Sequence, residues 1–165
     1  MMSLSLIIKS NIQTLEKADV ILSKLSNELL SDATTAPYYS SIGSHMRHIL
    51  DFYNCIFNIS DENKIDLTIR SRNTLIENSC EAAKMYLNTT LETLKKIDNH
   101  SNKAIIVIDD LGLGAIEIAT TLESILAQAN SHTIHHYAII NYILNNLNIT
   151  IEDPNFGFNY TTPIK

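Results

Sequence analysis

The sequence has no tryptophan, and among its 165 residues there are only four glycines, three prolines and two cysteines. So little glycine and proline excludes collagen-like and low-complexity chains. The two cysteines, Cys55 and Cys80, lack the C-x-x-C spacing of zinc and redox motifs, and they are too few for a disulfide-stapled secreted fold. We therefore expect two buried thiols in the reduced setting of the cytoplasm.

Basic clusters and long apolar runs are lacking as well. The densest basic groups are two pairs, Arg70 with Arg72 and Lys95 with Lys96, and the formal net charge is −6. Nucleic-acid-binding proteins carry a basic face, so nucleic acid is not an expected partner. No apolar run approaches the ~20 residues that span a bilayer, and the first residues lack the basic start of a signal peptide. The sequence predicts a cytoplasmic protein without a membrane span.

Hydrophobic residues make up 45% of the chain and charged residues 18%, which is typical of a globular domain. They recur at spacings of three and four, as on the buried stripe of a helix, in four segments, residues 3–30, 41–60, 73–97 and 120–147. The connections between these segments are short. The pattern predicts a single domain over residues 1–165, an all-α antiparallel four-helix bundle with an extended tail from Thr150 lying over it.

The stretch between the third and fourth helices has a different pattern. Residues 104–108 and 115–119 are short, apolar and rich in β-branched side chains, and a segment with two glycines separates them. This predicts a small β-hairpin. The sequence Thr120-Thr121-Leu122-Glu123 then fits a capping box, with Thr120 as the cap and Glu123 at the third helical position.

Histidines are concentrated on two of the predicted helices. His132 and His136 are four residues apart and share one face, so a single helix can offer two imidazoles to one metal ion. A helical wheel places both at the border of the apolar stripe and turns His135 toward a flank. On the second helix, the wheel does not choose between His45 and His48, although periodicity slightly favours His45 as the more buried.

A metal site is one of two explanations for these histidines. A single histidine on an apolar helix face is usually a core residue with a hydrogen-bond partner. Burying several neutral imidazoles without a ligand or partner costs a few kcal/mol in unmet hydrogen bonds. A metal ion or a polar pocket would remove that cost, and so would water.

Two segments, residues 41–51 and 131–138, resemble the DinB/YfiT-like superfamily, a group of metal-dependent four-helix-bundle proteins with a three-histidine site. The resemblance covers nearly the whole chain. It implies three metal ligands, His48, which directly precedes an aliphatic-X-Asp step, and His132 and His136, the ends of the H-x-x-x-H. One departure is Phe52, which stands where a histidine is common in one subgroup.

The same resemblance suggests a chemistry. Three imidazoles leave coordination positions open to water or substrate, as in catalytic rather than structural sites, and they suit zinc, nickel or iron. The resemblance implies a metal-dependent transferase or hydrolase that activates a thiolate, from a small-molecule thiol, or water. The competing interpretation is a non-catalytic dimeric scaffold, and a homodimer is expected under both.

Further side chains are candidates for the pocket around the metal. Arg70 and Arg72 can meet an anionic substrate with their planar donors, or they belong to a solvated loop paired with Asp66. His45, His135 and Tyr53 complete the predicted pocket, although buried tyrosines in bundles usually only pack.

Overall fold

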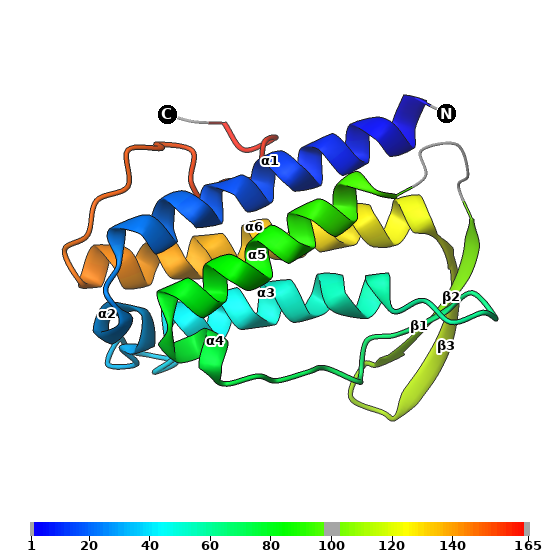
Figure 1. Cartoon of the computed structure of the whole chain (residues 1–165), viewed down its shortest axis with the longest axis horizontal. Helices are drawn as coiled ribbons and strands as arrows, with labels where there is room; N and C mark the ends of the chain where they lie inside the picture. Colours follow the sequence, from blue (N-terminus) through cyan, green and yellow to red (C-terminus); the bar gives the residue numbers. More distant parts are fainter. Residues whose placement is uncertain (1, 98–102, 164–165) are drawn as a thin grey trace.

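The computed structural model describes residues 2–97 and 103–163, and most of them are helical. Among the described residues no helix is long and apolar enough to cross a membrane. Two short helices, α2 (Asn27–Ser31) and α4 (Leu75–Asn78), flank one end of a bundle (Figure 1). The bundle consists of four long helices, α1 (Met2–Lys24), α3 (Ile42–Phe57), α5 (Cys80–Lys95) and α6 (Leu122–Asn146).

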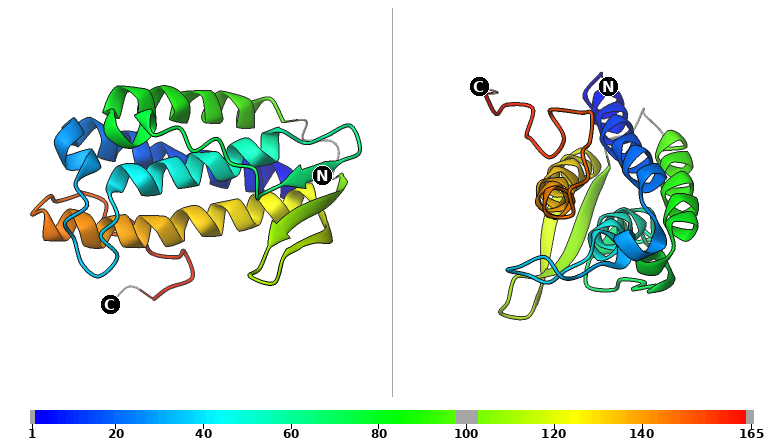
Figure 2. Two further views of the ribbon diagram at one scale, coloured as in Figure 1. Left: turned by 90° about the horizontal axis from the view of Figure 1, so that it is seen from below. Right: turned by 90° about the vertical axis from the view of Figure 1, so that its left-hand side faces the viewer.

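The four long helices do not alternate in direction around the bundle. Helices α1 and α3 each pack against both α5 and α6, so α1 and α3 lie on a diagonal of the bundle. Helices α1 and α6 run in one direction, and α3 and α5 run in the other (Figures 1 and 2). The chain between α3 and α5 returns along the bundle and contains a strand and α4. The predictions of short connections and of a fully antiparallel bundle were therefore wrong at this place, because α1 is parallel to α6 and α3 is parallel to α5.

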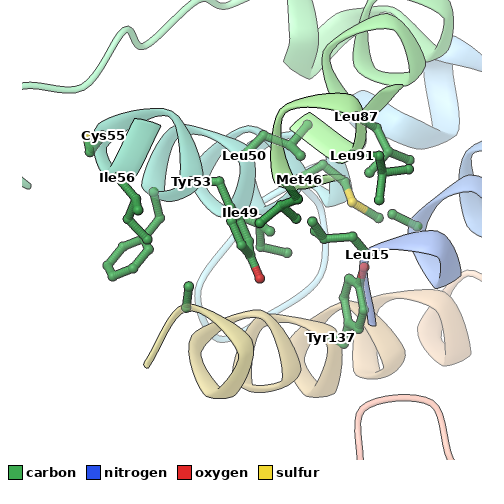
Figure 3. Close-up of a cluster of buried hydrophobic side chains, with 14 of the residues drawn as sticks. Leu15, Met46, Ile49, Leu50, Tyr53, Cys55, Ile56, Leu87, Leu91 and Tyr137 are labelled. Carbon is green, nitrogen blue, oxygen red and sulfur yellow. The ribbon is translucent and has the colours of Figure 1, made fainter. Parts of the chain in front are cut away.

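The bundle core is built from the apolar stripes of these helices. Ser41 begins α3 by accepting a hydrogen bond from the Ser44 N–H. The α3 residues Met46 and Ile49 are almost fully buried and face Leu15 of α1 across the core (Figure 3). This packing fixes the rotation of α3, and with it the direction in which its histidines point.

A three-stranded sheet lies at one end of the bundle, so the all-α prediction was wrong in part. Strands β2 (Ala104–Asp110) and β3 (Ala115–Thr121) form the predicted antiparallel hairpin. Strand β1 (Lys64–Asp66) pairs in parallel with β2, which makes the sheet mixed. A three-residue strand is too short to show a period of two, and its partner lies some forty residues later, beyond the reach of any local pattern.

Three helix boundaries differ from those predicted, because capping side chains begin or end the helices at other residues. Ser26 ends the first predicted helix early and caps α2, and Ser79 separates α4 from α5 in the same way. The cap of α6 is Thr121, whose side chain accepts a hydrogen bond from the Ser124 N–H. The cap is therefore one residue later than Thr120, the cap that the sequence predicted, because α6 begins at Leu122.

The tail lies over α1 and α6, as predicted. Lys17 and Asp153 form an ion pair at 2.6 Å. The Phe156 ring is buried against Tyr137, with their centroids 4.7 Å apart. Gly157 has a φ of +80° and lies against the α6 backbone, where a Cβ atom would have no room. The tail thus closes the core on the side of α6.

Candidate metal centre

Five histidines from two facing helices form one cluster. Helix α3 contributes His45 and His48, and α6 contributes His132, His135 and His136. Because α3 packs against α6, the histidine-bearing faces of the two helices meet. Side chains that are far apart in the sequence are thereby brought within reach of one another.

Three of the five converge on one point. One ring nitrogen from each of His48, His132 and His136 lies within 4.8 Å of the other two, an arrangement that could hold a metal ion. The centroids of the three rings are 4.5 to 4.9 Å apart. The Nε2 atom of His132 is buried and has no hydrogen-bond partner among the described residues. Such an orphaned atom costs about 1–3 kcal/mol, and metal coordination would satisfy it.

His45 lies beside this group and contacts one of its three rings. Its Nδ1 lies 2.8 Å from Nδ1 of His136, and its Nε2 lies 2.8 Å from Oγ of Ser40. Two facing ring nitrogens can bond only when one of them carries a proton. When His136 donates from Nδ1, its Nε2 keeps a free lone pair, and His45 donates from Nε2 to Ser40. This arrangement resembles the hydrogen bonds that orient metal-ligating histidines elsewhere.

Arg70 lies over the ring of His48. Its Nη1 atom is 2.9 Å from Nδ1 and 3.5 Å from Nε2 of that ring. The two lone-pair directions of an imidazole diverge in the ring plane, so a donor on one of them lies far from the other nitrogen. The two similar distances therefore place the guanidinium above the ring face, as in a cation–π contact. In this position the guanidinium does not occupy the in-plane lone-pair directions of His48.

Phe52 holds the third ring. It is 4% exposed and stacks on His132 with the ring centroids 4.8 Å apart and an interplanar angle of 29°. Phe52 thus forms an apolar wall of the site. Each of the three converging rings is positioned by a different neighbour, which limits its freedom before any ion binds.

The electrostatic environment keeps these rings neutral. Burial, aided by the positive charge of Arg70, lowers the pKa of His48 and of His132 to about 4. Burial, with smaller contributions from the neighbouring histidines, lowers the pKa of His136 to about 2. The pKa of His45 is also lowered by burial. A neutral imidazole is the form that binds a metal, so the cluster is ready for one at pH 7.

The remaining predicted pocket residues lie outside the group of three. His135 is exposed, although its ring meets that of His136 edge to face at 5.4 Å. Tyr53 is fully buried in the core, where its hydroxyl donates to Oδ1 of Asn11. Asp66 accepts hydrogen bonds from Thr68. Arg72 is exposed and has a positive φ.

Sequence reasoning did not assign a role to Asp51 or Ser40. The Asp51 carboxylate is fully buried and accepts hydrogen bonds from Arg47 at 2.9 Å, from the Tyr86 hydroxyl at 3.2 Å and from the Arg72 backbone N–H at 3.2 Å. It thereby ties the segment that carries Arg70 to α3. An aspartate within an apolar stripe, four residues after an arginine, is the signal that could have revealed it. Ser40 lies in a loop, where no periodicity reports on orientation.

No family model matches the chain, and no curated protein matches it. The argument for function therefore rests on the geometry of the histidine cluster, and membership of the DinB/YfiT-like superfamily stays a prediction.

Proposed function

We propose that this chain is a metal-binding protein of the DinB/YfiT-like type, in which His48, His132 and His136 hold one divalent zinc, nickel or iron ion. The observation that carries the proposal is the convergence of three neutral imidazoles, one of which, His132, has a buried ring nitrogen without a hydrogen-bond partner among the described residues. Three nitrogen ligands are the donor set of several catalytic sites, in which a further position remains for water or substrate.

The proposed activity is that of a metal-dependent transferase or hydrolase. When bound, such an ion lowers the pKa of a coordinated water or thiol and polarises an acceptor group. The chain itself supplies the surroundings. The Arg70 guanidinium lies beside the cluster and would stabilise an anionic substrate or a small-molecule thiolate. The apolar face of Phe52 excludes water from one side, and His45 orients His136.

The test of the metal site is the metal content per chain, measured by elemental mass spectrometry on untagged protein. We expect about one equivalent in the wild-type protein, and loss of the metal in His48→Ala and in His136→Ala. His135→Ala is the matched control, because it removes an exposed imidazole from the same cluster and leaves the three ligands and His45. Protein that stays metal-free after reconstitution with zinc, nickel and iron would overturn the proposal.

The activity itself needs a second assay. Metal-loaded protein, a low-molecular-weight thiol and 1-chloro-2,4-dinitrobenzene would be mixed, and thioether formation followed by absorbance. We expect a rate above that of the thiol alone, abolished in His136→Ala and reduced in Arg70→Gln. A metal-loaded protein without activity toward thiol or water nucleophiles would favour the scaffold interpretation.

We also propose that the chain forms a homodimer through β3. This strand is an edge of the sheet, and its side chains Ile116 and Ile118 are 44% and 38% exposed. At the adjoining turn, Leu111 and Leu113 are exposed as well. An uncovered apolar edge strand is a template for pairing, and two antiparallel copies satisfy a twofold axis. A stable dimer formed by a metal-free protein is the specific outcome that the scaffold interpretation requires.

Analytical ultracentrifugation tests the dimer. We expect a dimer for the wild-type protein and a monomer for Ile118→Lys. Val20→Lys is the control, because Val20 is 50% exposed on α1, away from the sheet. A wild-type monomer, or a dimer that Ile118→Lys leaves intact, would overturn the assignment of this interface.

A further inference from the structure

A groove opens beside the histidine cluster, between residues 35–40 and the second half of α6. Its volume is ≈ 920 Å³, within the range of small-molecule sites. Part of its lining is one face of α6, formed by four residues at spacings of four, four and three, His135, Ile139, Ile143 and Asn146. The eleven-residue step from the first to the last corresponds to a length of roughly 16 Å. Figure 2 shows the chain between α2 and α3 passing alongside this part of α6.

Hydrogen bonds fix the groove at both ends. At the end far from the cluster, Asn146 Nδ2 donates to Oγ1 of Thr35 at 3.0 Å. At the near end, Ser40 Oγ lies 2.8 Å from Nε2 of His45. The loop that forms the wall is thus attached to α6 through one contact and to α3 through the other. These two contacts hold the walls of the groove in place, which lowers the entropic cost of binding a ligand.

The chemistry of the lining restricts what can bind. Among the described residues, the lining contains no aspartate, glutamate, lysine or arginine, although the chain carries a net charge of −6. Its apolar lining comes from Pro37 and Tyr38 of the loop and from Ile139 and Ile143 of α6. Burying an ion against such a surface is costly, since nothing pairs with the charge.

Hydrogen-bonding groups gather at the end nearest the metal centre. Ser40, His45 and His135 all line the groove there, and His45 is also bonded to His136. A polar group on a ligand at this end would meet imidazole nitrogens and a hydroxyl. A ligand bound in the groove would therefore be one residue away from a proposed metal ligand.

We propose that this groove binds an uncharged, elongated and mainly apolar small molecule, with a hydrogen-bonding group at the end that lies against Ser40, His45 and His135. The inference that a ligand binds here depends on the groove alone. Its role as the substrate site of the metal centre rests on the proposed function, and the connection runs through His45 and His136.

A matched pair of fluorescent probes tests the absence of charge. N-phenyl-1-naphthylamine is uncharged, and 8-anilinonaphthalene-1-sulfonate has the same ring system with one added sulfonate. We expect saturable one-to-one binding of the uncharged probe to metal-free protein, at least tenfold tighter than that of the sulfonate. Equal affinities, or no binding of the uncharged probe, would overturn the proposal.

Substitutions locate the probe. Tyr38 and Tyr142 line the groove and are 77% and 75% exposed, so Tyr38→Glu and Tyr142→Glu bring a charge to it without disturbing the core. We expect each to weaken binding of N-phenyl-1-naphthylamine at least tenfold. Tyr39 is 65% exposed and does not line the groove, so Tyr39→Glu should bind as the wild type does. Circular dichroism verifies that each variant is folded.

The proposal for the groove and the proposal for the metal site can be contradicted by different results. Probe binding without any metal binding would retain the groove and remove the proposed function. Stoichiometric metal binding without probe binding would do the reverse. Probe affinity that falls as the protein concentration rises would assign the groove to a second copy of the chain, and this too would overturn the proposal.

Discussion

At the scale of single residues, His45 illustrates how a side chain can matter for a metal without touching it. Its ring is bonded to His136 on one side and to Ser40 on the other, so it holds the His136 ring in one orientation. Loss of such a partner typically weakens metal binding 10–100-fold. We therefore expect His45→Ala to keep one metal per chain and to lose about 10–100-fold in affinity.

Competition with a chelating dye measures that affinity. His135→Ala is the matched control, because His135 is exposed and only meets the edge of the His136 ring. We expect the affinity of this variant to stay within about threefold of wild type. An unchanged affinity in His45→Ala would contradict the orienting role, and complete loss of metal would make His45 a ligand.

Asp51 gives the second prediction at this scale. Its buried carboxylate accepts three hydrogen bonds, from Arg47, Tyr86 and the Arg72 backbone, and Arg47 also forms an ion pair with Glu77 that remains when Asp51 is removed. Losing hydrogen bonds to a buried charged group costs about 1.5–3 kcal/mol. We expect Asp51→Ala to lower the free energy of unfolding by about that much in urea titrations. Asp66→Ala, which removes only local bonds to Thr68, should cost less than about 1 kcal/mol.

The sequence reveals the α6 histidines more readily than the α3 histidine. The pair His132 and His136 follows from a local rule, because residues four apart on a helix always share a face. The choice between His45 and His48 depends on where the rings point. That is decided by Ser40 and Arg70, which lie in loops on either side of α3. Loop conformations have no period, so no helical wheel could have made this choice.

At the scale of elements, the long amphipathic helices and the hairpin could be predicted because each produces its own local pattern. The features that were missed depend on pairings between distant segments. Strand β1 exists because Ile65 aligns with Val107, and α3 and α5 run in the same direction because the chain between them spans the bundle. The helix breaks at Ser26 and Ser79 arise from single capping side chains. The apolar periodicity continues on both sides of each serine, so it does not reveal the break.

The contact between α3 and α4 gives a prediction at this scale. Gly43 lies in the first turn of α3, and a Cβ atom there would collide with the carbonyl group of Glu77 in α4. Alanine favours a helix over glycine by about 0.5–1 kcal/mol, but overpacking costs about 1–3 kcal/mol. We expect Gly43→Ala to lower the melting temperature in spite of its higher helix propensity.

Ser44→Ala is the control for that experiment. Ser44 is the next residue, and its hydroxyl donates only within the first turn, to the Ser41 carbonyl. The variant tests helix propensity at the same place without a collision, and we expect its melting temperature to change little. Equal melting temperatures for Gly43→Ala and the wild type would show that α4 can move away from α3 at little cost.

At the scale of the whole molecule, the cluster lies between two different environments. On one side, the cationic guanidinium of Arg70 covers His48. On the other, an uncharged groove ends at His45. An anionic group and an apolar group of the same reaction could thus approach the centre at different histidines. This division suits a reaction with two substrates of unlike polarity, such as transfer from a thiolate to an apolar acceptor.

The histidine cluster also makes the stability of the metal-free protein depend on pH. An unfolded histidine titrates near 6.5, whereas the folded pKa values are about 4 for His48 and His132 and about 2 for His136. Below pH 6.5 the unfolded chain therefore binds protons that the folded chain does not, and stability falls as the pH falls. Above pH 6.5 these three groups contribute no further change.

We expect the free energy of unfolding to fall by roughly 2–4 kcal/mol between pH 7.5 and pH 5, after allowance for the partial exposure of the rings. This window lies above the range in which most carboxylates titrate. Urea titrations in the presence of a chelator measure the change, and His136→Asn should reduce it, since one of the four histidines with a lowered pKa is removed. A free energy of unfolding that is constant across this window would mean that the folded cluster accepts protons as readily as the unfolded chain. The pKa values of the three rings would then not be lowered by burial, and the rings would not be kept neutral for a metal ion.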